Sequence, residues 1–200
     1  MPTAHFYDDN QRLYVRHSTF PIQQPPYCLT VNCRNTQNIH QMVVKFYEAE
    51  VSPTARGPLG RHVEVIPYGD PQSLRPTLQD ILRWLTVDEQ IPTDEIVVLT
   101  PRALSKARLL QGSASTGPLL TDTWPPSPGQ VYCTTIYDFK GLERAVVILA
   151  DIRRWPPDWD DMVRLLYVGC SRARNHLIVL LAQNAPRKVQ RAFTAIRGRK

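Results

Sequence analysis

The chain has 200 residues, 42% of them hydrophobic and 21% charged, with a formal net charge of +6 and a pI of about 9.3. This length supports one sizeable domain with its own core, and the basic balance favours polyanionic partners, because neutralised phosphates release counterions. The apolar runs are far too short to cross a bilayer and no charged-then-apolar leader follows Met1, so we expect a cytoplasmic protein without membrane contact.

The amino-terminal residues 1–26 hold a short apolar run, a polar stretch and a proline-rich link. Beyond them, apolar side chains recur at helical spacing in two segments, and Asn35 or Thr36 is placed to cap the first of these helices. A last segment, from Pro186, carries basic residues opposite an apolar face. The three helical faces consist of Ile39, Met42, Val43, Phe46 and Tyr47; of Leu78, Ile81, Leu82 and Leu85; and of Val189, Ala192, Phe193 and Ile196.

The other patterns alternate between strand and helix. Short runs rich in Val and Ile predict strands over residues 28–31, 63–68, 95–100, 131–136, 145–150 and 177–182. Helices are predicted over residues 103–110 and 160–174, and the proline-rich segment 112–129 is typical of a long surface loop. Because several strands are continuous apolar runs, we expect them to be buried on both faces. The predicted fold class is therefore α/β, a three-layer parallel sheet flanked by helices.

Polar clusters follow the predicted strands, where ligands bind in open α/β sheets. Near the amino terminus, Gln11 is suited to hold a water or a phosphate oxygen and Tyr14 to stack on a base, although Asp and Asn here also favour a simple turn. In the segment Asn32–Thr36, Arg34 offers a forked pair of donors to a phosphate. A helix cap with an incidental arginine is the alternative for that segment.

A third cluster occupies residues 134–143, where a glycine permits a tight turn between a lysine and a glutamate. The threonine and tyrosine before this turn are suited to face a nucleic-acid backbone or base, and a hairpin-like turn is the alternative. The candidate residues of this cluster are Thr135, Tyr137, Lys140, Gly141 and Glu143.

The fourth cluster, residues 164–174, combines arginines with an apolar helical pattern. Arg172 is expected to project from the packed helix, at a position where a charge needs a partner. A solvated arginine at a helix end is the alternative interpretation.

Taken in order, these clusters resemble the motifs of the UvrD/Rep-like superfamily I helicases. The resemblance begins at motif III and covers nearly the whole chain. Motif III is matched by Asp8, Gln11 and Tyr14; motif IV by Asn32, Arg34 and Thr36; motif V by Thr135 and Lys140–Glu143; and motif VI by Leu166–Gly169 and Ser171–Ala173. Four motifs in order form a specific signal, whereas any one of them alone would be weak.

The resemblance implies an ATP site shared between two RecA-like domains. In the family, the first domain supplies the phosphate loop and the Mg²⁺ carboxylate, and the second supplies arginines that meet the γ-phosphate. By match, Arg172 is the arginine finger, Arg34 a second γ-phosphate arginine and Gln11 a γ-phosphate sensor. The other implied contacts are Lys140, Gly141 and Glu143 around the nucleotide, and Thr135, Tyr137 and Tyr14 along the single strand.

The sequence holds no GxxxxGK[ST] phosphate loop and no Asp-Glu pair of the Walker B kind after an apolar strand. We therefore expect residues 1–26 to be a remnant of the first RecA-like domain plus a linker, and residues 27–200 to be the second RecA-like domain. The expected function is the C-terminal domain of an ATP-dependent DNA helicase that is inactive alone. Its expected partners are single-stranded DNA and the N-terminal RecA-like domain; RNA as the strand, and repair, recombination or defence as the pathway, stay open.

Two other functions stay open. A non-catalytic RecA-like module that binds nucleic acid or protein would share this fold, and an unrelated α/β nucleotide-binding domain would hold a complete ATP site of its own. The expected cofactors are ATP and Mg²⁺, bound mainly by the missing first domain. The cysteines at positions 28, 33, 133 and 170 have no CxxC spacing, so we expect reduced thiols and no metal site.

Overall fold

The computed structural model describes residues 29–48, 51–104, 109–110, 117–153 and 159–194. A six-stranded sheet forms its centre, with the strand order β3-β8-β7-β4-β6-β5 and every neighbouring pair parallel. The strands are β3 (Glu64–Tyr68), β4 (Ile96–Thr100), β5 (Leu119–Thr121), β6 (Gln130–Thr135), β7 (Arg144–Ile152) and β8 (Ala173–Ala182).

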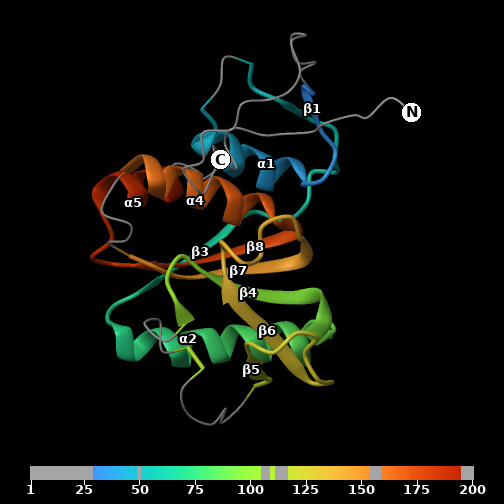
Figure 1. Cartoon of the computed structure of the whole chain (residues 1–200), viewed down its shortest axis with the longest axis vertical. Helices are drawn as coiled ribbons and strands as arrows, with labels where there is room; N and C mark the ends of the chain where they lie inside the picture. Colours follow the sequence, from blue (N-terminus) through green and yellow to red (C-terminus); the bar gives the residue numbers. More distant parts are fainter. Residues whose placement is uncertain (1–28, 49–50, 105–108, 111–116, 154–158, 195–200) are drawn as a thin grey trace, which may run out of the picture.

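Helices cover both faces of this sheet, as Figure 1 shows. The helices α1 (Gln37–Val43), α4 (Trp159–Ser171) and α5 (Arg187–Thr194) lie on one face, and α2 (Pro71–Arg83) lies on the other. Three short helical turns complete the layers: η2 (Val44–Phe46), η3 (Trp84–Asp88) and η4 (Thr93–Glu95). The predicted class, a three-layer α/β fold with a parallel sheet, is confirmed.

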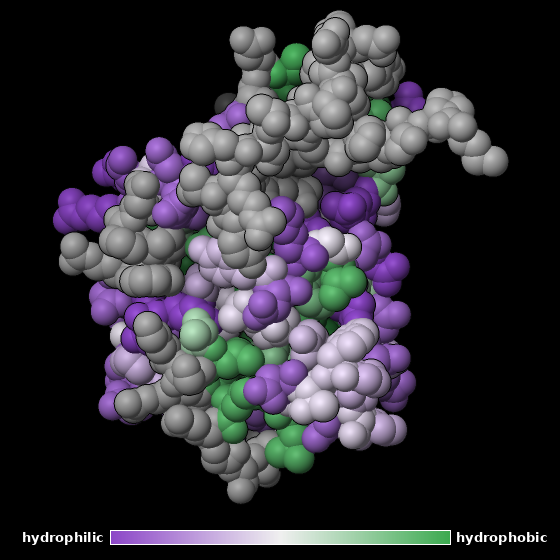
Figure 2. All heavy atoms as spheres, viewed as in Figure 1, coloured by the Kyte–Doolittle hydropathy of each residue, from purple (hydrophilic) through white to green (hydrophobic). Residues whose placement is uncertain are grey.

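The core consists of the apolar strands and the apolar helical faces that the sequence predicted. All five residues of β4 are buried, as are the last seven of β7 and of β8, because helices cover both faces of these central strands. On the α5 side, the rings of Phe46 and Phe193 lie 5.5 Å apart between centroids. The outer surface over α5 is hydrophilic (Figure 2), as its predicted amphipathic pattern requires.

Two local predictions about strands were wrong. The apolar run expected over residues 28–31 yields only β1 (Val31–Asn32), which pairs with β2 (Thr54–Ala55) in a separate two-stranded ribbon. Leu29 and Val31 stay exposed, so this run does not enter the core. The expected loop over 112–129 contains β5, an edge strand too short for its pattern to be recognised.

The end of α4 also differs from the prediction. The helix stops at Ser171 instead of continuing to Arg174, and β8 begins at Ala173 instead of Leu177. Pairing of Ala173 with Arg144 of β7 fixes this early start, so the sheet register overrides the local helical pattern. Arg172 consequently lies in the turn between helix and strand.

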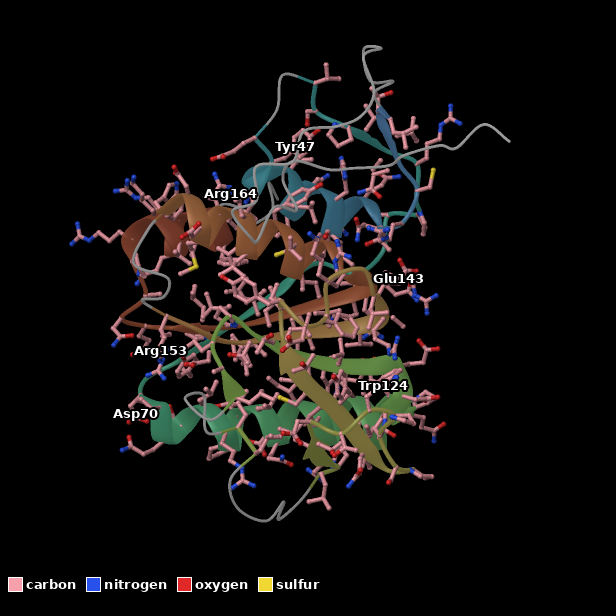
Figure 3. The ribbon with its side chains drawn as sticks, in the orientation of Figure 1. Tyr47, Asp70, Trp124, Glu143, Arg153 and Arg164 are labelled. Carbon is pink, nitrogen blue, oxygen red and sulfur yellow. The ribbon has the colours of Figure 1, made fainter. Side chains whose placement is uncertain are left out.

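The strands β6 and β7 do not form a hairpin, because β4 lies between them and all three are parallel. Thr135 ends β6 at the carboxyl edge of the sheet, beside Thr100, whereas β7 starts at the amino edge. The segment 136–143 therefore crosses from one edge to the other, with the fully buried Phe139 as its anchor. Figure 3 places Glu143 and Trp124 on one side of the molecule and Asp70 and Arg153 on the opposite side.

Some predictions fall outside the described residues. These are the proposed domain remnant in residues 1–26, with Gln11 and Tyr14, and most of the helix expected over 103–110. Among the helices that the structure does describe, none has the length and apolar character needed to cross a membrane.

Candidate functional site

Three segments meet at the amino edge of the sheet: the loop 32–36, the start of β7 and the turn after α4. The Asn35 side chain joins two of them, since its Nδ2 donates to the Ala173 carbonyl at 2.6 Å and to the Ser171 carbonyl at 3.2 Å. The third is attached by the Arg144 amide, which donates to the Arg172 carbonyl at 3.1 Å. We call this junction, made of Arg34, Asn35, Leu142, Glu143 and Arg172, the arginine corner.

Arg34 is the exposed cation of the arginine corner. Its Nε lies 2.8 Å from Oε2 of Glu143, and both side chains remain more than two-fifths exposed. The structure thus brings into contact two residues that are 109 positions apart and belong to two different predicted motifs. A half-exposed guanidinium with one carboxylate partner keeps donors available for an incoming anion.

Arg172 does not project into solvent as the sequence led us to expect. Its residue is 2% exposed, and its guanidinium folds back onto the last turn of α4. There it donates to the Val168 carbonyl at 3.1 Å, to the Ser171 hydroxyl at 2.9 Å and, more weakly, to the Leu142 carbonyl at 3.4 Å. The early end of α4 accounts for this, because the turn directs the side chain inward.

The loop that carries Arg34 is held by its own polar side chains. Asn32 Oδ1 accepts from the Arg34 amide at 3.0 Å, and Asn32 Nδ2 donates to Asn35 Oδ1 at 2.8 Å. Thr36, one of the two predicted caps, occupies the N-cap position of α1, but neither it nor Asn35 caps the helix with a side-chain hydrogen bond. Instead the first helical amides, of Gln37 and Asn38, donate to the carbonyls of residues 58 and 59.

Two glycines let the segment 57–60 approach this loop. A Cβ on Gly57 would lie 2.4 Å from the Asn35 carbonyl oxygen, and one on Gly60 would lie 2.3 Å from Thr36 Cβ. Gly60 also has a φ of +71°, which disfavours other residues. The close contact between segment 57–60 and the loop 32–36 holds the backbone of the loop that carries Arg34.

The remaining motif V residues divide between the two edges of the sheet. Lys140 is exposed at the crossing segment, and Gly141 adopts a φ of +93°, which confirms the tight turn expected there. Thr135 lies at the carboxyl edge, where its hydroxyl donates to Asp138 Oδ2 at 2.6 Å. Tyr137 is half-buried against the core, and Thr135 lies at the edge of the sheet opposite to the arginine corner.

A buried ionic cluster at the carboxyl edge was not found from the sequence. Asp151, 1% exposed, accepts from the Tyr68 hydroxyl at 3.1 Å, and its carboxylate lies 2.7 Å from Arg153 Nε and 3.9 Å from Arg102. Burial raises the pKa of the Asp151 carboxyl, and the neighbouring cations and hydrogen bonds partly offset this rise. Only the folded register brings these four residues together, so no spacing in the sequence marks them.

Trp124 was also missed as a site residue, because its Trp-Pro-Pro context predicted only a loop. It lines a cavity of about 440 Å³ next to the arginine corner, together with Glu143. Trp159, by contrast, packs under the Lys188 ammonium at 5.3 Å. Trp155 lies outside the described residues.

The sheet order and the helical layers define an α/β domain of the RecA-like type. The solved structure of the C-terminal domain of a possible DNA helicase from Lactobacillus plantarum WCFS1 is similar, with a TM-score of 0.60 and 20% identity, over 76% of this chain and 89% of that one. The PRRSV helicase matches over 76% of this chain and 23% of its own length at 16% identity, and its TM-score of 0.36 is too low to bear on the fold.

The family comparison covers the segment that holds the predicted motifs V and VI. Residues 130–180 match the UvrD-like helicase C-terminal domain family. The matched segment spans β6, the crossing segment, β7, α4 and most of β8, and so includes Glu143 and Arg172. A search of curated proteins finds no match to the chain. The resemblance stated from the sequence is thereby supported over residues 130–180, which are similar to the UvrD-like helicase C-terminal domain.

Proposed function

We propose that this chain supplies the second half of a composite ATP site in an ATP-dependent DNA helicase. Arg34 and Arg172 would meet the γ-phosphate, Glu143 and Gly141 would adjoin the nucleotide with Lys140, and Gln11 would sense the γ-phosphate. The N-terminal RecA-like domain would supply the phosphate loop and the magnesium carboxylate. A cytoplasmic location follows from the same proposal.

One observation carries this proposal most strongly. Three segments that are far apart in the sequence converge on the arginine corner, and buried hydrogen bonds from Asn35 hold two of them together. The exposed Arg34 fork suits phosphate oxygens, because a planar guanidinium binds them through two parallel hydrogen bonds. ATP bound there would bring the negative charge that such a corner stabilises in phosphoryl transfer.

The two arginines would not act alike. Arg34 is half-exposed, whereas Arg172 is buried and donates to the Leu142 carbonyl and the Ser171 hydroxyl. To reach a phosphate, the Arg172 guanidinium must leave the Ser171 hydroxyl and the Leu142 carbonyl. We therefore propose that closure of the two domains on ATP moves Arg172 outward, so that it acts as a finger only in the closed state.

The single strand would run along the carboxyl edge of the sheet, away from the arginine corner. Thr135 and Tyr137 belong to the segment that leaves this edge, and Tyr14 of the preceding domain would add a stacking surface. The net charge of +6 favours such a partner. DNA is proposed as the strand, by analogy with the family.

The test is mutation of both arginines in the full-length helicase. Arg34→Ala and Arg172→Ala are expected to lower the ATPase kcat by about a thousandfold, since a finger arginine contributes on that order, with single-strand affinity nearly unchanged. Arg172→Lys should fail to restore turnover, because it lacks the planar fork. Arg61→Ala, which removes an arginine paired with Glu89 elsewhere, is the control.

Other outcomes would contradict the proposal. Equal loss of turnover and strand binding would assign Arg172 a structural role. A wild-type full-length protein that binds the strand but hydrolyses no ATP would instead favour a non-catalytic binding module. Magnesium-dependent hydrolysis by this chain alone would show that it holds a complete site of its own.

A further inference from the structure

The cavity beside the arginine corner lies at the amino edge of the sheet. Its volume is about 440 Å³, and it opens between the start of β4, the start of β7 and the Trp-Pro-Pro loop. Glu143 belongs both to this cavity and to the ion pair with Arg34. A molecule that touches Arg34 and extends past Glu143 would therefore enter the cavity.

Trp124 provides an aromatic wall that is already held in place. The Arg144 guanidinium lies 5.1 Å from the Trp124 ring centroid and 5.8 Å from that of Phe139, and Tyr132 meets the indole edge-on at 5.1 Å. Despite these contacts, Trp124 remains 53% exposed. A fixed indole with open surface favours stacking by a planar ligand.

The polar groups around the indole suit a base better than a phosphate. Three carboxylates (Asp94, Glu95 and Glu143) and two guanidiniums (Arg144 and Arg174) line the cavity, which gives a net formal charge of −1. This charge disfavours a phosphate chain. Glu95 and Arg174 pair at 3.1 Å with both side chains more than two-fifths exposed, so one wall presents acceptors and donors side by side, as the edge of a nucleobase requires.

We propose that this cavity binds the nucleobase of the nucleotide whose phosphates meet Arg34. The base stacks on Trp124, the sugar passes Glu143, and the phosphates lie at the arginine corner. The proposal rests on the composite ATP site proposed above. A base of the single strand has the same chemistry, but the cavity and Thr135 lie at opposite edges of the sheet, which favours the nucleotide as the source.

The test uses steady-state ATPase kinetics of the full-length helicase with a Trp124→Leu substitution. Loss of one base-stacking contact should raise the KM for ATP by about tenfold, while kcat persists, because the phosphate contacts are retained. Trp124→Phe keeps an aromatic face and should return KM most of the way to the wild-type value. Trp159→Leu, which changes a tryptophan packed under Lys188, is the matched control.

The outcomes separate this inference from the proposed function. An unchanged KM in Trp124→Leu, with Arg34→Ala still inactive, would overturn the base site and leave the composite ATP site standing. Weaker single-strand binding at unchanged KM would overturn it too, since the base would then come from the strand. If circular dichroism shows that Trp124→Leu is unfolded, the aromatic variants Trp124→Phe and Trp124→Tyr take its place. Both must keep the KM for ATP within about threefold of the wild-type value, a smaller change than the loss of one stacked base would cause. A larger rise in KM overturns the proposal.

Discussion

Asn35 is the residue on which the geometry of the arginine corner depends most directly. Its amide hydrogens reach two backbone carbonyls in the turn that carries Arg172, at a position only 2% exposed. Arg34, its neighbour in sequence, has no comparable link to that turn among the described contacts. The Asn35 side chain thus determines the position of the neighbouring Arg34 relative to the turn that carries Arg172.

Asn35→Asp should therefore lower the free energy of unfolding by about 1–3 kcal/mol, because a carboxylate oxygen would replace the donor that faces the Ser171 and Ala173 carbonyls. Urea unfolding of the chain measures this change. Gln37→Glu makes the same amide-to-acid change at an exposed side chain that donates to the Gly57 carbonyl, and should cost less than about 0.5 kcal/mol. Equal effects of the two substitutions would contradict the role given to Asn35.

The cysteines offer a second test at this scale. Burial raises the pKa of Cys133 to about 12 and also raises the pKa of Cys170, whereas Cys33 is exposed. Because the thiolate is the reactive form, a maleimide at pH 7 to 9 should label Cys33 and spare Cys133 and Cys170 until urea unfolds the chain. Peptide mass spectrometry reads the labelled positions. Rapid labelling of Cys133 in the folded protein would mean that β6 is less well packed than described.

Motif order predicted that Arg34 and Glu143 lie near each other, but it did not predict that Arg172 is buried. Arg34 and Glu143 were selected by motif order, and the structure places them in contact, while their roles at a nucleotide stay predictions. The burial of Arg172 was not predictable, because it depends on where α4 stops, and the apolar pattern continues past that residue. Trp124 was overlooked because the residues that hold its indole in place, Tyr132 and Arg144, come next to it only in the folded chain.

Among the elements, the segment 57–60 acts as a support for the loop that carries Arg34. Gly60→Ala should destabilise the protein by about 1–3 kcal/mol, because it combines strain at a φ of +71° with a clash against Thr36. Gly129→Ala introduces similar strain at a φ of +80° with nothing within 4 Å, so it isolates the strain alone. Thermal unfolding of both variants measures the difference.

The expected order is a lower melting temperature for Gly60→Ala than for Gly129→Ala. If Gly129→Ala is equally destabilised, then backbone strain accounts for the whole loss of stability and the contact with Thr36 contributes nothing.

At the scale of elements, contacts between strands explain the errors in the predicted strand boundaries. The starts of β8 and β5 are set by pairing with β7 and β6, which a reading of local spacing does not include.

The whole molecule was predicted better than its parts. Continuous apolar runs separated by helical stripes were enough to indicate a parallel sheet between helical layers. They did not indicate strand order, and strand order is what places β4 between β6 and β7. The crossing segment that follows from this order divides the motif V residues, with Thr135 at one edge and Glu143 at the other.

The central claim is that the arginine corner meets a nucleotide and is not merely a structural ion pair. Exchanging the charges, as Arg34→Glu with Glu143→Arg, keeps an ion pair possible but removes the cation from the loop 32–36. The full-length double variant should fold with near-wild-type stability yet remain deficient in ATP turnover. The same exchange at the Arg61 and Glu89 pair should leave turnover unchanged. Wild-type ATPase activity in the Arg34 and Glu143 exchange would contradict the account.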